Sequence, residues 1–277
     1  MTVPNVPNWA RVLLLIAIWT SFGPQLHRLK RKKESSGISL WYILFNLLNA
    51  TEQLAFSVFF AVNDENGVFT HKSQTTGDWI NLVQFAGVFL LWFTISGLSL
   101  RLPSDDTRRW PKITTSTLFG VAVAVAAPLF VPRPSSEPGE GSSARDVASL
   151  FSFIHSRFLF PIFTLLSLVA LVPQVRTTRS RPHRGALSLS GLAIQGVLFL
   201  IDAFAWVGRL EFPWDEFDGS ESSWKKLLDW YQGVGWVPVN NGLSAVVKMV
   251  ILSLTIRHWW RRDRREERSG ETEPLLA

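Results

Sequence analysis

Seven blocks of apolar residues divide the chain, and each is about as long as a lipid bilayer is thick. They lie at about 9–26, 38–62, 79–100, 113–131, 147–172, 186–210 and 236–257, each bounded by proline, glycine or charge. A helix of about 20 residues crosses a hydrocarbon layer of roughly 30 Å. The pattern therefore predicts an all-α membrane protein with seven transmembrane helices.

The basic residues between these blocks predict which way the chain is inserted. One side of the predicted membrane takes the connections 1–2, 3–4 and 5–6 and the C-terminal tail, with 19 Lys or Arg. The other side has 7. Short cytosolic loops are rich in Lys and Arg, so we expect a lumenal N-terminus and a cytosolic C-terminus.

Composition narrows the possible functions. The net charge of +6 gathers in short strips beside the predicted membrane, where it faces anionic lipid, so no nucleic-acid partner is expected. The chain has no cysteine, and its five histidines show no metal-ligand spacing. It also lacks a phosphate-binding loop, a nucleophile elbow and an acid pair at catalytic spacing. We therefore expect neither an enzyme nor a bound metal or cofactor.

A duplication relates the two halves of the chain. Residues 24–40 read PQLHRLKRKKESSGISL and residues 173–189 read PQVRTTRSRPHRGALSL, so a shift of 149 superimposes Pro-Gln and Ser-Leu without a gap. Both copies start on the same predicted side, which requires an odd number of linking helices. The sequence thus predicts parallel triple-helix repeats in a 3+1+3 order. The predicted units are 1–100 (first bundle), 101–146 (linker helix and lumenal loop), 147–257 (second bundle) and 258–277 (cytosolic tail).

With these two motifs the chain resembles the PQ-loop family of membrane transporters. That family includes lysosomal and vacuolar exporters of cystine and cationic amino acids and is related to the SWEET sugar transporters. The resemblance implies proton-coupled export of amino acids or similar small solutes from vacuole or lysosome to cytosol. Transporters built from repeats bind substrate near the membrane midplane, between the repeats.

The Pro-Gln pairs have two interpretations. A proline within a helix removes a hydrogen bond and creates a kink. Pro24 and Pro173 would then be hinges of a cytosolic gate, with Gln25 and Gln174 satisfying the carbonyls that the break frees. Alternatively, each pair only ends its helix, and a basic loop of about a dozen residues follows.

Four residues deep in the predicted spans are charged when ionised: Glu52, Arg157, Asp202 and Lys248. Such residues face the interior of a bundle and often bind protons or substrate. The proton-coupling candidates are Asp202, Glu52 and His155, and the resemblance implies an acidic residue in the second repeat, for which Asp202 is the nearest match. The alternative is structural pairing, of Asp202 with Lys248 and of Glu52 with His155 or Arg157.

Amide side chains also gather in the spans and suggest a site for a polar solute. Amides equally hold membrane helices together by hydrogen bonding, so both roles stay open. The resemblance to SWEET proteins implies a substrate role for those in the third helix of each repeat. The substrate-binding candidates are Asn46, Asn81, Gln84, Asn240, Asn241, Lys248 and Arg157.

The C-terminal tail contains a possible sorting signal. Glu271 precedes the pair Leu275 and Leu276 by four residues, which resembles the acidic dileucine signal read by sorting adaptors. This feature favours a vacuolar or lysosomal membrane.

Two other functions fit the same pattern. One is an uncoupled, SWEET-like sugar facilitator, and the other is a non-transporting receptor or nutrient-sensing scaffold. The internal duplication and the absence of a lumenal cysteine pair argue against a G-protein-coupled receptor.

Overall fold

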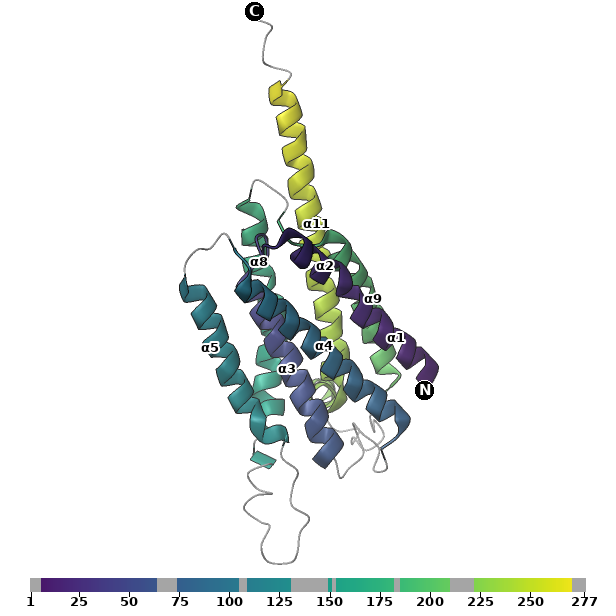
Figure 1. Cartoon of the computed structure of the whole chain (residues 1–277). Coiled ribbons are helices and arrows are strands. Elements are labelled where there is room, and N and C mark those ends of the chain that lie inside the picture. Colours follow the sequence, from purple (N-terminus) through teal and green to yellow (C-terminus); the bar gives the residue numbers. More distant parts are fainter. Residues whose placement is uncertain are drawn as a thin grey trace, which may run out of the picture.

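The computed structural model describes residues 6–63, 74–104, 109–130, 149–150, 153–181, 185–209 and 222–270, apart from the side chains of 263 and 265–270. Every regular element in these ranges is a helix (Figure 1). The elements are α1 (Asn8–Ser21), α2 (Gly23–Lys32), α3 (Leu40–Asn63), α4 (Thr76–Arg101), α5 (Arg109–Ala126), the 3-10 turn η1 (Ala127–Phe130), the π turn η2 (His155–Leu159), α7 (Phe160–Val169), α8 (Leu171–Arg179), α9 (Leu189–Val207), α10 (Ser223–Trp230), the π turn η4 (Tyr231–Gly235) and α11 (Trp236–Gly270).

Six stretches of this structure are long and apolar enough to cross a membrane. They are Leu40–Asn63, Thr76–Arg101, Arg109–Phe130, His155–Arg179, Leu189–Val207 and Ser223–Arg262. Large apolar side chains such as Leu90, Leu165 and Phe204 are exposed on the surface of the bundle, where a soluble protein would place polar groups. The chain is therefore a multi-pass membrane protein.

The first predicted span is interrupted in the structure. Helix α1 has 14 residues and ends at Ser21, and α2 begins at Gly23 after a tight turn at Phe22. Alone, α1 is shorter than the roughly 20 residues that a membrane crossing needs. The number of membrane spans is thus six if α1 is counted as too short, and seven if α1 and the start of α2 together form one span.

The expectation that helices end at Pro-Gln is wrong. Helix α2 continues past Pro24 to Lys32, and α8 continues past Pro173 to Arg179. Each break lies upstream of its proline, at Phe22 and Ala170. Proline fits the first turn of a new helix because the amide hydrogen it lacks would have no intrahelical partner there. The first part of each basic segment, to Lys32 and to Arg179, is therefore helical.

The helices pack in two similar sets. The first unit consists of α1, α3 and α4, with α2 continuing α1, and the second unit consists of α7, α9 and α11, with η2 preceding α7 and α8 continuing it. In each unit the third helix packs against both the first and the second. Between the units, α1 packs against α9 and α7 packs against α3. The same pairwise contacts thus recur under exchange of the units. Helix α5 stands at the side of the bundle and packs mainly on α3 (Figure 1).

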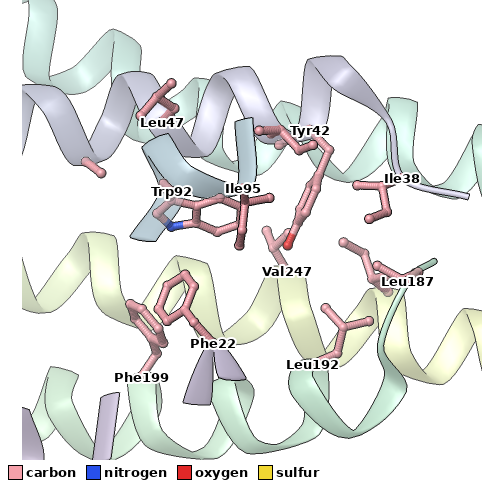
Figure 2. Close-up of a cluster of buried hydrophobic side chains, with 14 of the residues drawn as sticks. Phe22, Ile38, Tyr42, Leu47, Trp92, Ile95, Leu187, Leu192, Phe199 and Val247 are labelled. Atoms are coloured by element: carbon pink, nitrogen blue, oxygen red, sulfur yellow. The ribbon is translucent and has the colours of Figure 1, made fainter. Parts of the chain in front are cut away.

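Both Pro-Gln motifs lie at the same end of the bundle, here named the Pro-Gln end (top in Figure 1). Near this end a core of buried apolar side chains joins the two units. Figure 2 shows Tyr42, Trp92 and Phe22 of the first unit meeting Phe199 and Val247 of the second. A second core, nearer the opposite end, is built largely of aromatic rings, including Phe56, Phe160 and Trp236.

Candidate functional site

The side chain of Gln25 links the first unit to the chain entering the second helix of the second unit. Its Nε2 donates to the carbonyl of Ala186 at 3.0 Å, and its Oε1 accepts from the backbone N–H of Ser188 at 2.8 Å. Ser188 is the N-cap of α9. The first amides of a helix have no intrahelical acceptor, so Gln25 satisfies the backbone where α9 begins.

Gln174 makes the equivalent two bonds from the second unit to the first. Its Nε2 donates to the carbonyl of Gly37 at 2.9 Å, and its Oε1 accepts from the N–H of Ser39 at 3.0 Å, just before α3. Adding 149 to Gln25, Gly37 and Ser39 gives Gln174, Ala186 and Ser188. We name these four bonds the glutamine clasp.

The clasp corrects the expected role of the two glutamines. We expected them to satisfy carbonyls freed at the helix breaks, whereas they bind the opposite unit. At the first break, the carbonyl of Ser21 instead accepts from Gln195 of α9 at 3.4 Å. The duplicated Ser-Leu pair also gains a reason, because its serine supplies the N–H that each glutamine binds.

The segments that enter α3 and α9 touch directly beneath the clasp. Gly37 has φ +87°, a conformation that glycine adopts without strain. A Cβ added to Gly185 would lie 2.2 Å from the carbonyl oxygen of Ser36. Ala186 donates its N–H to that same oxygen at 2.5 Å. The absence of side chains therefore allows the two units to close at the Pro-Gln end.

Asp202 holds together three helices on the other side of the bundle centre. Its Oδ2 accepts from Gln84 of α4 at 2.8 Å, from Asn241 of α11 at 2.8 Å and from the indole of Trp206 at 3.1 Å. Its Oδ1 accepts from Arg209 at 3.2 Å, and both side chains are buried. The carboxylate thus has a buried cation and several hydrogen bonds.

Arg209 was not among the candidates predicted from the sequence, because it lies at the edge of the sixth apolar block. Its NH1 donates to Gln84 at 2.9 Å and to Asn81 at 3.4 Å. The structure thereby unites three substrate candidates with Asp202. We name Asn81, Gln84, Asp202, Arg209 and Asn241 the polar cluster. A seven-residue spacing from Asp202, two helical turns, was the signal that could have indicated Arg209.

Lys248 is buried on α11, two turns from Asn241 towards the Pro-Gln end. Its Nζ lies 4.4 Å from the centre of the Phe199 ring and 5.8 Å from that of Trp92. It donates weakly to the carbonyl of Ser244 at 3.5 Å. No carboxylate in the described part of the chain forms an ion pair with it, so the expected pairing with Asp202 is absent.

Glu52 pairs with His155, and the alternative pairing with Arg157 is not formed. Oε1 of Glu52 lies 2.5 Å from Nδ1 of His155. Arg157 instead donates to Gln232 of η4 at 2.6 Å and faces the surface. The two proton candidates of the first and second units are therefore in contact.

The other candidates have more local surroundings. Asn46 donates to the carbonyl of Tyr42 one turn earlier, which is a structural role. Asn240 accepts from Thr164 at 2.7 Å, and its Nδ2 has no hydrogen-bond partner. The sorting residues Glu271, Leu275 and Leu276 lie outside the described residues.

A hollow lies between the clasp and the buried aromatic side chains of Figure 2. It is mainly apolar, with the amides of Gln25 and Gln195 and the Tyr42 ring in its wall. The lining residues are Gln25, Ile38, Tyr42, Ile43, Trp92, Ile95, Leu187, Gly191, Leu192 and Gln195. Both units thus form this hollow.

No protein-family model, curated protein or solved structure matches the chain.

The site combines two closures with an interior cation between them. The clasp joins the units at the Pro-Gln end, and the polar cluster joins α4, α9 and α11 towards the other end. Lys248 lies between the two closures. No group of three metal-binding side chains occurs in the ranges the structure describes. This arrangement places a cation without a described ion-pair partner between two sets of inter-helix hydrogen bonds.

Proposed function

We propose that the chain is a seven-helix transporter of the PQ-loop type that moves amino acids or similar small solutes from vacuole or lysosome to cytosol. In this proposal α1 and the start of α2 form the first span, and α5 links two parallel three-helix units. The recurrence of the same helix contacts under exchange of the units supports that arrangement. The placement of a broken helix at the start of both units supports it as well.

The observation that carries the proposal is the glutamine clasp. Four hydrogen bonds, related by one shift of 149 residues, close the Pro-Gln end by joining each unit to the other. The helix breaks at Phe22 and Ala170 lie next to the clasp and supply the hinges. Alternating access then proceeds by breaking the clasp on one side and the polar cluster on the other.

Substrate binds between the closures. The Lys248 ammonium, which lacks a described carboxylate partner, takes the carboxylate of an amino acid. The neighbouring rings of Phe199 and Trp92 keep this site apolar, and charge attraction strengthens in such surroundings. Asn241, two turns away, offers an amide to the remaining polar groups of the solute.

The Lys and Arg distribution supports placing the Pro-Gln end in the cytosol. The last turns of α2 and α8 are basic there, at positions facing anionic lipid. The dileucine motif of the tail would then meet cytosolic adaptors. Solute moves from the lumen, past the polar cluster, to the clasp.

A flux assay tests the proposal. Purified protein in liposomes receives an amino-acid panel under an acid gradient that mimics the vacuolar lumen. We expect uptake of at least one amino acid, faster with the gradient than without it. Flux that ignores pH would replace the proposal with an uncoupled facilitator. No flux of any amino acid or sugar, together with specific binding of a cytosolic protein, would replace it with a receptor or scaffold.

A further inference from the structure

Glu52 and His155 form a buried acid–base pair between the two units. Glu52 lies on α3, and His155 opens the π turn η2 that leads into α7. The facing atoms, Oε1 and Nδ1, are 2.5 Å apart, and the two side chains are 3% and 0% exposed. Two bare acceptors would repel at this distance, so a hydrogen lies between them.

The surroundings of this pair are buried and rich in aromatic rings. The ring of Phe56 lies 6.3 Å from that of His155, and Phe56 also contacts Phe160 and Trp236. Nε2 of His155 is buried without a hydrogen-bond partner, and so is Oδ1 of Asn49, about one turn from Glu52 on α3. Buried polar atoms are nearly always paired, so Nε2 of His155 is a nitrogen at which the pair can take up a further proton.

Other titratable groups on the elements packed around the pair are engaged elsewhere or lie at the ends of their helices. The Tyr231 hydroxyl shares a hydrogen bond with Thr164, and Arg157 donates to Gln232. No cation is among the described hydrogen-bond or ion-pair partners of Glu52, apart from His155 itself. The remaining groups with described side chains are Tyr42 on α3, Asp78 and Arg101 on α4, Arg109 and Lys112 on α5, Arg176 and Arg179 on α8, and Lys248, Arg257, His258, Arg261, Arg262 and Arg264 on α11. Of these, Lys248 lies in the interior of its helix and packs on the rings of Phe199 and Trp92.

The net charge of the pair explains why it takes up one added proton, besides the hydrogen that already lies between Oε1 and Nδ1. Without it, Nδ1–H donates to the Glu52 carboxylate, and a net charge of −1 is buried among aromatic rings, which is costly. With it, the pair is neutral overall, as imidazolium with carboxylate or as imidazole with carboxylic acid. Asp202 differs because Arg209 already neutralises it. The Glu52–His155 pair has no such fixed counter-charge among its described partners.

The backbone at His155 adds a second sign of function. Residues His155–Leu159 form a π turn, and Phe160 donates its N–H to the carbonyl of His155. Such turns are rare and are found frequently at functional sites. Conversion of this turn to regular α-helix would rotate His155 away from Glu52 and separate the pair. The two residues belong to different units, so their separation is tied to movement between the units.

We propose that the Glu52–His155 pair, not Asp202, is the proton-binding site that couples transport to the lumenal proton gradient. This inference rests on the proposed transport function. One proton from lumenal water joins the pair while the units are parted at this end, and the closed pair holds it. The same proton leaves to cytosolic water after the clasp opens at the Pro-Gln end. No electron moves and no other bond forms, and proton release and substrate release then both follow the opening of the clasp.

The first test needs no substrate. When the loaded pair shares one hydrogen between Oε1 and Nδ1, the second hydrogen is on Nε2 of His155, which is bare in the unloaded pair. Protein labelled with ¹⁵N-histidine is followed by NMR across the range in which histidine changes charge, about pH 5 to 8. His155→Gln assigns the signal, and the other four histidines are internal controls. We expect Nε2 to change with pH in the native chain, and the change to vanish or move by more than one pH unit in Glu52→Gln.

The second test compares this result with flux. We expect Glu52→Gln to lose at least tenfold of the stimulation by acid of the amino-acid flux that the native protein carries. Flux without a pH response of Nε2, or with an unchanged response in Glu52→Gln, would overturn the proton site and leave transport intact. A Glu52-dependent response of Nε2 without any flux would keep the proton site and overturn transport.

Discussion

The buried charged residues of this bundle differ in whether they have an ion-pair partner. Asp202 and Arg209 satisfy each other and bind three helices. Lys248 is equally buried, yet it has only aromatic rings and a distant carbonyl as neighbours. A buried charge is destabilising unless it is paired. In the proposed function, Lys248 binds the substrate, and its burial without a described ion-pair partner lowers stability.

Lys248→Met tests this view of the lysine. Methionine has similar length and removes the charge, so we expect the melting temperature to stay level or rise while amino-acid uptake falls at least tenfold. Thermal unfolding in detergent and liposome flux measure the two effects. Lys112→Met on α5, whose ammonium bonds only to nearby carbonyls, is the matched control and should keep its flux. Parallel loss of stability and flux in Lys248→Met would assign the lysine a structural role.

Asp202 and Arg209 are expected to behave as one structural unit. Removing one partner of a buried ion pair costs about 3–5 kcal/mol because the other charge stays behind. We expect Asp202→Asn and Arg209→Gln each to destabilise by roughly this amount. The double variant should lose less than the sum of the two. A double-mutant cycle in chemical denaturation measures the coupling, and strict additivity would contradict it.

At the scale of elements, the decisive feature is the break ahead of each proline. It shortens α1, places Pro24 in the first turn of α2, and turns both predicted basic loops into helices. The segments that enter α3 and α9 then pass each other with their backbones almost in contact. Gly37 and Gly185 provide that space.

Gly185→Ala should destabilise the protein by about 1–3 kcal/mol, because overpacking against backbone forces the chain to move. The added methyl would lie 2.2 Å from the carbonyl oxygen of Ser36. Gly97→Ala, in the interior of α4 with nothing within 4 Å of the new carbon, is the control. It should stabilise by about 0.5–1 kcal/mol. Equal melting temperatures for the two variants would mean that the crossing is looser than its geometry suggests.

Sequence reasoning predicted the helices but not their partners. Apolar length suffices to place α3, α4, α5, α9 and most of α11, because lipid demands helices of one minimum length. It fails at α1, where local turn geometry at Phe22 overrides the apolar block. It also missed the clasp and Arg209, since both depend on contacts between distant segments. The pattern marked Asn81, Gln84 and Asn241 as polar and inward-facing, yet only packing shows that they meet at Asp202.

At the scale of the whole molecule, two similar units hold each other closed by the same contacts. Each glutamine supplies two bonds, and a typical bond contributes about 0.5–1.5 kcal/mol. Loss of one glutamine thus favours opening at the Pro-Gln end by about 1–3 kcal/mol, or roughly 5- to 150-fold. Because the bonds are equivalent, Gln25 and Gln174 should matter about equally.

The absence of native cysteine makes opening directly measurable. Leu192→Cys places a single thiol in the wall of the hollow. We expect Gln25→Ala and Gln174→Ala each to accelerate its labelling by a maleimide at least fivefold. Gln232→Ala, which removes a surface partner of Arg157, should leave the rate unchanged. A large effect from one glutamine alone would show that the two halves of the clasp are not equivalent.

The clasp also has a consequence for biosynthesis. Gln25 finds its partners 161 and 163 residues later, so the first unit leaves the ribosome long before its capping contacts exist. The end of α3 that begins at Leu40 likewise waits for Gln174. Each unit therefore lacks the hydrogen bonds of the clasp until the other unit has been made. Two separate polypeptides, divided between α5 and α7, should therefore accumulate in cells when made together and be degraded when either is made alone.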